Sequence, residues 1–459
     1  MQEGGPQRCA PGLHLTTRER TATMMRTTKT GMSRAAGLGA AVAITAVTLA
    51  GCGRADDGAG ASGASEGVSD GPATGTIELW AAGAEGEELP ELFDAFIEDN
   101  PDVDINMTPI PEEDFVTKMT AAIAAGTVPD LIYVFAEHQP ALFATEAFAP
   151  VPDGLVDESA FFESVWETGQ VDDVAYGVPW FTYARVFQYR ADLAEAAGVD
   201  APENWDDLRE FARTLKDTGV AYPLGFYVVP FDEYTAAQFD TFAHQNGGGI
   251  IDDDNSAWTI NSPENVEALE FYSSLFADGF VSPDGPTSVD SVAYLTEGRL
   301  AGVLNGPWLR GWIKDANGQE WLDAHMAALV PPAGPDGERA ASIGGGNWAV
   351  PEDADNADAA WKFVQYASEP EVQLTWFGLM GNLPTVKVAW DDPAIADDEA
   401  LDEVRAAMEF GVPIPAVPTW NQVGKILGEQ IERVVRGGAT PQEALDTAQA
   451  EAESIGVGR

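Results

Sequence analysis

Apolar and polar positions alternate with two different periods from Thr76 onward. The segments 76–80 and 103–107 follow a period of two, and 130–134 is a mainly apolar run typical of a buried strand. Between them, apolar residues return at helical spacing: Leu89, Leu92, Phe93 and Phe96, then Phe115, Met119 and Ile123. Strands that alternate with helices of about 10 to 15 residues predict an α/β fold with a parallel sheet covered on both faces.

Signals for helix starts continue through the rest of the chain. Asn204 can cap a helix with one apolar face, and Ser262 precedes a proline at the first helical position. Thr440 and Glu443 form a capping box before the last predicted helix. About 385 residues of such alternating elements are too many for one sheet, so the pattern favours two α/β lobes.

The first 75 residues have a different pattern. The apolar run Ala35–Leu49 follows a basic flank and leads into Leu49-Ala50-Gly51-Cys52. This pattern predicts a signal peptide over residues 1–51, whose N-terminal part is longer than a signal peptide needs. A cysteine at this place resembles the bacterial lipoprotein box, which implies lipidation of Cys52; an ordinary signal peptide with a coincidental cysteine is the alternative. Residues 52–75 are expected to be the lipidated cysteine and a flexible Gly/Ala/Ser linker.

Charge narrows the function classes. Six of the 24 Lys and Arg precede Cys52, but only two of the 75 Asp and Glu do, so the chain after it carries a net charge of −55 (18 − 73). This excess opposes binding to nucleic acid or to an anionic membrane surface. An acidic surface is also consistent with a saline habitat.

Catalytic and metal motifs are weak. The pattern Gly63–Gly67 matches a hydrolase elbow but lies in the linker, and 252–255 lacks the glycine and distal glutamate of a calcium loop. The three histidines after Cys52 have no zinc-ligand spacing. We therefore expect no metal, cofactor or catalytic residue. Two alternatives stay open: a secreted glycoside hydrolase, or a surface carbohydrate-binding lipoprotein that takes no part in transport.

Several segments together resemble the extracellular solute-binding proteins of carbohydrate ABC importers, the family that includes maltose-binding protein. They are 124–130, 175–179, 189–193, 204–208, 297–302, 305–308 and 344–350. The resemblance implies a periplasmic-binding-protein-like fold, in which two α/β lobes are joined by a three-segment hinge with a ligand cleft between them. Residues 76–183 and 340–371 would form lobe 1, and 184–339 and 372–459 lobe 2. The three crossings are expected near 182–186, 334–342 and 369–373.

The resemblance also implies a function and a set of ligand contacts. The protein would bind a mono- or oligosaccharide without being an enzyme, and would deliver it to membrane permease subunits. It would act as a monomer, lipid-anchored to the outer face of the cell membrane in the Gram-positive manner. Trp308 and Trp420 match sugar-stacking tryptophans. Further expected contacts are Tyr183 at the first crossing, Glu137 and His138 after a strand, Asp232 and Tyr234 in a cleft-facing segment, the glycine-rich stretch Gly345, Gly346, Asn347 and Trp348, and Glu85.

Glu85 marks a departure from that family. It is the one polar residue of the stretch 81–85, where maltose-binding protein offers several polar and charged groups. This difference points to a smaller ligand or to another hydroxyl pattern than a maltodextrin has.

Overall fold

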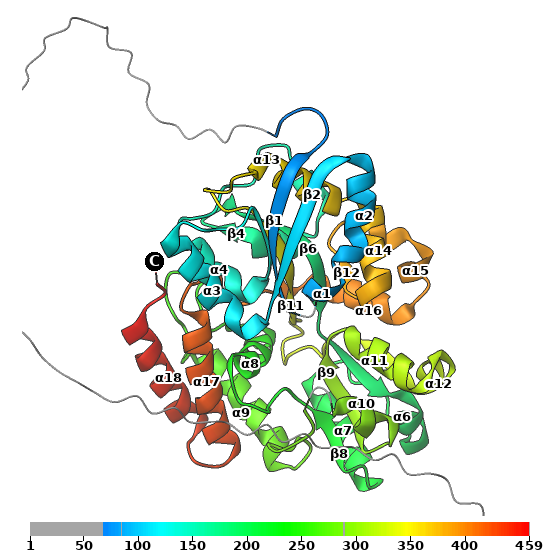
Figure 1. The fold of residues 1–459 in the computed structure, drawn as a ribbon. Helices are drawn as coiled ribbons and strands as arrows, with labels where there is room; N and C mark the ends of the chain where they lie inside the picture. Colours follow the sequence, from blue (N-terminus) through cyan, green and yellow to red (C-terminus); the bar gives the residue numbers. More distant parts are fainter. Residues whose placement is uncertain (1–67, 84, 288–289, 459) are drawn as a thin grey trace, which may run out of the picture. The chain divides into compact units, whose positions relative to one another are not determined.

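The structure is a computed structural model that describes residues 68–83, 85–287 and 290–458. Its strands form two main sheets, and we call the parts of the chain built on them the first and the second lobe (Figure 1). The predicted signal peptide and Cys52 lie outside the described residues. Within the described ranges, no helix has the length and apolar character needed to cross a membrane.

The first lobe is built on a mixed sheet with the strand order β12-β6-β11-β3-β1-β2, and β13 pairs with β11. β1 runs parallel to β2 and β3, whereas β11 runs antiparallel to β3 and β6. The wholly parallel sheet expected from the pattern is therefore wrong, because β11 enters from the other lobe and not through a crossover helix. The strands are β1 (Thr74–Ala82), β2 (Asp102–Ile110), β3 (Leu131–Phe135), β6 (Gly177–Ala184), β11 (Ala341–Ala349), β12 (Leu383–Pro384) and β13 (Gly411–Val412).

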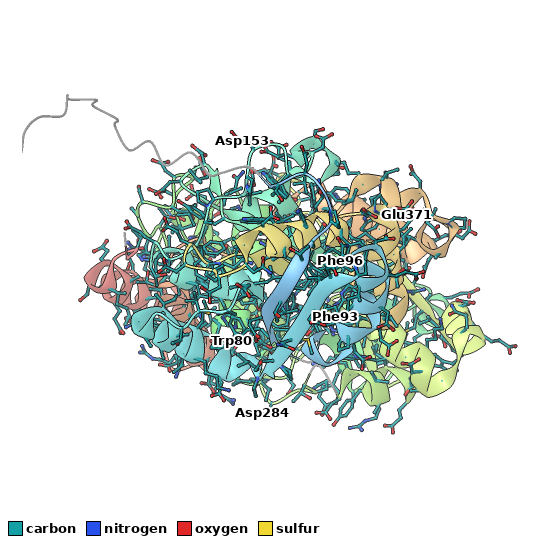
Figure 2. All side chains as sticks on the ribbon, turned by 45° about the horizontal axis from the view of Figure 1, so that its top comes forward. Trp80, Phe93, Phe96, Asp153, Asp284 and Glu371 are labelled. Atoms are coloured by element: carbon teal, nitrogen blue, oxygen red, sulfur yellow. The ribbon has the colours of Figure 1, made fainter. Side chains whose placement is uncertain are left out.

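Helices cover this sheet and enclose its core. Phe93 and Phe96 of α2 meet the ring of Phe363 on α13 edge-on, with centroids 5.8 and 5.2 Å apart. Figure 2 shows Phe93 and Phe96 beside the strands, whereas Asp153, Asp284 and Glu371 lie toward the outside. The helices are α1 (Glu85–Glu88), α2 (Pro90–Asp99), α3 (Glu112–Ala125), α4 (Gln139–Phe143), α5 (Glu163–Trp166), α13 (Ala357–Ala367), α14 (Pro370–Met380), α15 (Pro393–Ala396) and α16 (Glu399–Met408).

Short elements complete this part of the chain. The 3₁₀ turn η1 follows β3 directly, and a two-stranded hairpin precedes β6. Their bounds are η1 (Ala136–His138), η2 (Glu158–Ala160), η3 (Glu167–Gly169), η4 (Lys387–Asp391), β4 (Gln170–Val171) and β5 (Val174–Ala175).

The second lobe is built on the sheet β10-β7-β9-β8, in which only the β8–β9 pair is parallel among the described strands. The strands are β7 (Val186–Arg190), β8 (Tyr222–Gly225), β9 (Leu300–Asn305) and β10 (Met326–Leu329). The helices are α6 (Ala191–Ala197), α7 (Trp205–Asp217), α8 (Glu233–Gln245), α9 (Pro263–Ala277), α10 (Ser291–Thr296), α11 (Trp308–Asn317), α12 (Gln319–His325), α17 (Trp420–Val435) and α18 (Pro441–Ile455).

The predicted helix starts are confirmed. The Asn204 side chain accepts a hydrogen bond from the backbone N–H of Asp207, and Ser262 accepts one from Asn265. Thr440 forms the expected capping box with Glu443. These signals are readable from sequence because the partners lie only three residues apart.

The chain passes between the two sheets at three places. β6 ends at Ala184 in the first sheet and β7 begins at Val186 in the second, so Arg185 alone separates them. The second passage is the segment 330–340 between β10 and β11. The third was expected near 369–373, but β12 pairs with β6 in the first sheet and β13 pairs with β11. The return to the second lobe therefore lies in 413–419. Residues 372–412, which were expected in the second lobe, belong to the first.

Part of the expected linker is ordered. The backbone N–H and the hydroxyl of Ser69 donate to the Asp358 carboxylate at 2.7 and 2.8 Å. The N–H of Ala73 donates to Asn100 Oδ1 at 2.6 Å, and β1 begins at Thr74. The flexible linker predicted over 52–75 therefore does not include 68–75, which these hydrogen bonds help to hold against the first lobe.

Candidate functional site

A narrow cavity of about 30 Å³ lies where the two lobes and the hinge meet. A volume of this size holds about one water molecule. Its lining comes from η1, from the end of β6, from β11, and from α8 and α17 of the second lobe. The residues are Glu137, His138, Tyr183, Arg185, Glu233, Tyr234, Ala237, Ser342, Ile343, Gly344, Ile414, Trp420 and Asn421.

Three glutamates gather here because of the topology of the first sheet. The parallel strands β1, β2 and β3 are each followed within three residues by a carboxylate: Glu85, Glu112 and Glu137. The carboxyl ends of parallel strands meet at one edge, which is where such sheets bind ligands. Each glutamate also stands at the start of a helix or 3₁₀ turn, where the helix dipole favours a negative charge.

Tyr234 joins the two lobes at this edge. Its hydroxyl oxygen lies 3.3 Å from Oε1 of Glu112 and 3.3 Å from Oε1 of Glu137. Tyr234 belongs to α8 of the second lobe, and the two carboxylates belong to the first. Burial raises the pKa of Glu137, and Glu112 raises it further, whereas His138 and hydrogen bonds from the backbone and from Tyr234 oppose the rise.

His138 lies beside the same carboxylates. Its Nε2 is 3.6 Å from Oε1 of Glu112, and neither ring nitrogen has a hydrogen-bond partner among the described residues. Burial lowers the pKa of His138, but Glu112 and Glu137 outweigh burial and raise it above its ordinary value. The imidazole can therefore carry a charge and donate to a ligand.

An aromatic wall, formed by Tyr183 and Trp308, lies beside the hinge, and of the two rings Tyr183 lines the cavity. The rings of Tyr183 and Trp308 meet edge-on with centroids 4.9 Å apart. The guanidinium carbon of Arg185 lies 5.5 to 5.9 Å from the ring centres of Trp308, Tyr227 and Tyr183. Among the described residues that line the cavity, Arg185 is the single Lys or Arg, and no ion pair joins it to a described carboxylate within 4.0 Å. This wall supplies flat apolar faces and a cation beside them.

The backbone before α11 explains where Trp308 lies. A Cβ at position 306 would come within 2.1 Å of the indole ring, so Gly306 leaves the room that the ring occupies. Gln188 Nε2 donates to the carbonyls of Asn305 and Gly306 at 3.2 and 2.7 Å. This turn therefore holds Trp308 against Tyr183.

Tyr133 and Glu85 extend the site inside the first lobe. The Tyr133 hydroxyl is buried and has no hydrogen-bond partner among the described residues. Burial raises the pKa of Tyr133, and the charges of Glu85, Glu137 and Glu112 raise it further. Burial also raises the pKa of Glu85, although hydrogen bonding from its own backbone opposes the rise. The hydroxyl therefore lies within the electrostatic reach of all three glutamates.

The glycine-rich stretch makes room for aromatic rings. A Cβ at position 346 would come within 2.4 Å of the Tyr133 ring, and one at 344 within 2.3 Å of the Tyr183 hydroxyl. Gly345 has φ +156°, and its Cβ would meet the carbonyl oxygen of Phe181 at 2.0 Å. These glycines thus shape the site through the tyrosines they admit, and Gly344 itself lines the cavity.

Three of the expected contacts have structural partners instead. Trp348 is fully buried and packs on Trp180, Tyr133 and Phe363. Asn347 donates to Gln139 at 2.9 Å and to Thr168 at 3.1 Å. Asp232 caps α8 in a capping box. Because the ring or polar atoms of each are occupied inside the protein, we leave these three out of the site proposed below.

Trp420 belongs both to the cavity lining and to the hydrophobic core. It lines the cavity but is only 2 % exposed and belongs to the core of the second lobe. Trp205 and Trp361, on α7 and α13, are buried in the cores of the two lobes. Trp205 stacks on Phe271 at 4.2 Å, and its indole N–H donates to Gln245.

Sequence reasoning missed Glu112, Tyr133 and Arg185. The signal that selected Glu137 is a polar residue directly after a predicted parallel strand. Glu112 escaped it because it lies five residues beyond the predicted strand 103–107, whereas β2 in fact extends to Ile110. Tyr133 was hidden because it belongs to a buried strand. Arg185 lies within the expected first crossing, 182–186, where no local pattern marks it as a ligand contact.

A second, larger cavity of about 580 Å³ adjoins the first and shares Ile343 and Ile414 with it. Carboxylates from both lobes line it, among them Glu167 and Asp173 of the first and Asp240 and Asp253 of the second. Its volume is within the usual range for small-molecule sites, about 300 to 1,000 Å³. Among the described residues no group of His, Cys, Asp and Glu has a geometry suited to a metal ion.

Two α/β lobes joined by a hinge, with residues of both lobes lining the cavity between them, are the architecture of a two-lobed binding protein. The sequence profile of the bacterial extracellular solute-binding protein family matches residues 80–374, more than half of the chain, and the chain belongs to this family. The expected family and fold class are thereby confirmed.

Known relatives agree with this assignment. The sn-glycerol-3-phosphate-binding periplasmic protein UgpB of Escherichia coli K12 is 26 % identical over 408 residues, which cover 81 % of this chain and 90 % of that protein. A putative binding protein of Brucella abortus is 25 % identical over 377 residues, with the same coverage. The structure of the sugar-binding protein MalE from Xanthomonas citri superimposes with a TM-score of 0.76 at 26 % identity, covering 83 % of this chain and 97 % of that one.

These similarities establish the general role. The chain is an extracytoplasmic solute-binding protein of an ABC transporter for sugars or related solutes. The family is not enzymatic, which decides against the glycoside hydrolase considered from the sequence.

Proposed function

We propose that this protein captures a mono- or oligosaccharide in the cleft between its lobes and delivers it to membrane permease subunits. The observation that carries the proposal is that Tyr183 lines one cavity together with Glu137 and His138, while its ring contacts that of Trp308 at 4.9 Å. Sugars present C–H faces that stack on aromatic rings, and hydroxyls that bond to carboxylate and imidazole groups. The ligand contacts are Trp308, Tyr183, Glu137, His138, Tyr234 and Glu85, joined by Glu112 and Arg185, with Trp420 at the back.

Capture proceeds by closure of the two lobes. Tyr234 of the second lobe contacts Glu112 and Glu137 of the first, so a ligand bound there contacts both lobes. A shift from mostly open to mostly closed needs a differential affinity of roughly 5 kcal/mol. Small-angle scattering tests this step, because an unchanged radius of gyration at saturation would remove the closing mechanism.

Glycerol 3-phosphate is the second candidate, since UgpB of Escherichia coli binds it by name at 26 % identity. Among the described residues that line the cavity, the groups that can offer a positive charge to a phosphate are Arg185 and His138, whereas Glu112, Glu137 and Glu233 lie close by. Unpaired carboxylates repel a phosphate in a partly buried site. This arrangement favours a sugar.

A thermal-shift screen tests the proposed ligand class. A ligand that binds only the folded protein raises its melting temperature. We expect at least one sugar of a broad panel to stabilise the protein more than glycerol 3-phosphate does at equal concentration. Stabilisation by glycerol 3-phosphate alone would contradict the proposal.

We further propose that Cys52 is lipidated and holds the protein on the outer face of the cytoplasmic membrane, as in Gram-positive bacteria. The support is the sequence Leu49-Ala50-Gly51-Cys52 after an apolar run, followed by a linker. One acyl chain binds a membrane only marginally, so a stable tether takes two.

A further inference from the structure

The proposed sugar site has an excess of negative charge. Glu137 and Glu233 line the cavity, Glu112 contacts Tyr234, and Glu85 acts electrostatically on Tyr133. Against these four carboxylates stands the guanidinium of Arg185, which lies over aromatic rings and has no described carboxylate within 4.0 Å. His138 offsets at most one further charge.

The carboxylates at the site also have few hydrogen-bond donors beside them. The Tyr234 hydroxyl carries one proton, yet two carboxylate oxygens lie 3.3 Å from it, so at least one of them receives no hydrogen from it. His138 makes no hydrogen bond with a described residue, and its Nε2 lies 3.6 Å from Glu112. Among the described residues, the side-chain donors found beside Glu112 and Glu137 are the Tyr234 hydroxyl and, 3.6 Å from Glu112, His138 Nε2, which are fewer than two carboxylates can accept from.

A buried hydroxyl of the first lobe, within the electrostatic influence of Glu85, Glu112 and Glu137, is also unpaired within the described part of the chain. Tyr133 is 0 % exposed, and its Oη has no partner among the described residues. Leaving a buried polar group unpaired costs about 1 to 3 kcal/mol, so such a group in a cleft is suited to a ligand atom. Burial and mutual repulsion, which raise the pKa of Glu85 and of Glu137, agree with carboxylates that lack a full counter-charge.

The excess of negative charge and the shortage of hydrogen-bond donors indicate which ligand group would fit. A sugar hydroxyl brings one donor but also acceptor lone pairs, and it carries no charge. A protonated amino group brings three donors, no acceptor and one positive charge. Aromatic faces such as those of Tyr183 and Trp308 also attract cations.

We infer that the ligand is an amino sugar whose protonated amino group binds between Glu112 and Glu137, close to the Tyr133 hydroxyl. The inference rests on the proposed function and narrows its substrate class. The aromatic wall then stacks on the sugar ring, and Arg185 donates to ring hydroxyls on the opposite side. An acetylated amine keeps the ring but loses the charge and two donors, so it fits the site poorly.

Matched sugars test the inference directly. Calorimetric titration of the purified protein would compare glucose, glucosamine and N-acetylglucosamine, the corresponding galactose series, and chitosan disaccharide with its acetylated form. A charge-assisted hydrogen bond is about twice as strong as a neutral one, and we expect the amine to bind about tenfold or more tightly than its neutral partner in at least one series. The preference should fade at alkaline pH, where the amine loses its proton.

Substitutions test whether the two carboxylates cause the preference for the amine over its neutral partner. Glu137→Gln and Glu112→Gln should each reduce it to within about threefold, because each removes one charge without changing shape. Glu98→Gln, on the exposed side of α2, removes the same charge away from the site and should leave the preference intact. Melting curves confirm that each variant is folded.

The outcomes separate this inference from the proposed function. Neutral sugars that bind as tightly as their amines, or more tightly, overturn the amino-sugar assignment and leave sugar capture standing. An amine preference that both Gln variants retain in full also overturns the assigned position. If no sugar of either kind binds, both proposals are wrong.

Discussion

The hydroxyl oxygen of Tyr234 on α8 lies 3.3 Å from Oε1 of Glu137 on η1, and this contact joins the second lobe to the first. The same hydroxyl lies equally close to Glu112 at the start of α3. Figure 1 shows α8 beside α3 where the two lobes meet. A single hydroxyl between two carboxylates thus joins the two lobes across the cleft.

Removing this hydroxyl should weaken ligand binding. Tyr234→Phe keeps the ring but deletes the bond to the carboxylates, and a hydrogen bond to a charged group contributes about 1.5 to 3 kcal/mol. Because closure contributes to affinity, we expect Kd to rise about tenfold in calorimetric titration. Tyr272→Phe is the matched control, since its buried hydroxyl has no described partner. Equal affinities in the two variants would disprove the role of Tyr234.

Glu137 should make stability depend on pH. Its pKa in the folded protein is raised above 4.5. Well below pH 4.5 both states are protonated, and as pH rises the unfolded state ionises first, so the free energy of unfolding falls until pH passes the folded-state pKa. The glutamine in Glu137→Gln cannot ionise. The melting temperature of the variant minus that of the wild type should therefore increase as pH rises from about 4 to 7. A difference that does not change with pH would contradict this.

Gly346 should tolerate no side chain. Its φ is not in the left-handed region, but an added Cβ would come within 2.4 Å of the Tyr133 ring. Gly346→Ala should therefore lower the free energy of unfolding by about 1 to 3 kcal/mol through overpacking. Gly311→Ala on α11, where a Cβ meets nothing within 4 Å, should instead stabilise by up to about 1 kcal/mol. Denaturant unfolding measures both, and equal effects would refute the packing argument.

The lipid anchor has its own test. Cys52→Ala removes the proposed attachment point, so the protein should appear in the soluble fraction or retain its signal peptide. Changing Ser65→Ala in the following linker should leave membrane attachment unchanged. Full recovery of the Cys52 variant in washed membranes, with the signal peptide removed, would show that another feature holds the protein there.

Local signals made much of the fold predictable. Asn204, Ser262 and Thr440 were identified as caps because their partners are three residues away. The third passage between the lobes was misplaced for the opposite reason. β12 is only two residues long, and it exists through pairing with β6 some 200 positions earlier, which no local pattern records.

The site was predictable only in part. Glu137 and His138 could be found because the end of a parallel strand is a general place for ligands. Trp348 and Trp308 cannot be told apart by composition, since both are tryptophans after a glycine-containing stretch. Long-range packing separates them: Trp348 is enclosed by Trp180 and Phe363, whereas Trp308 lies beside Tyr183 at the cleft.

The central claim is that a sugar stacks on Trp308 in the cleft between the lobes, and calorimetric titration of the best-bound sugar into Trp308→Ala tests it most directly. Truncating such an anchor costs about 2 kcal/mol or more, so Kd should rise about 30-fold. Trp205→Ala, which opens a cavity in the second lobe's core, should lose about 3 to 5 kcal/mol of stability yet keep its affinity while folded. Wild-type affinity in a folded Trp308→Ala protein would contradict the claim and place the ligand elsewhere.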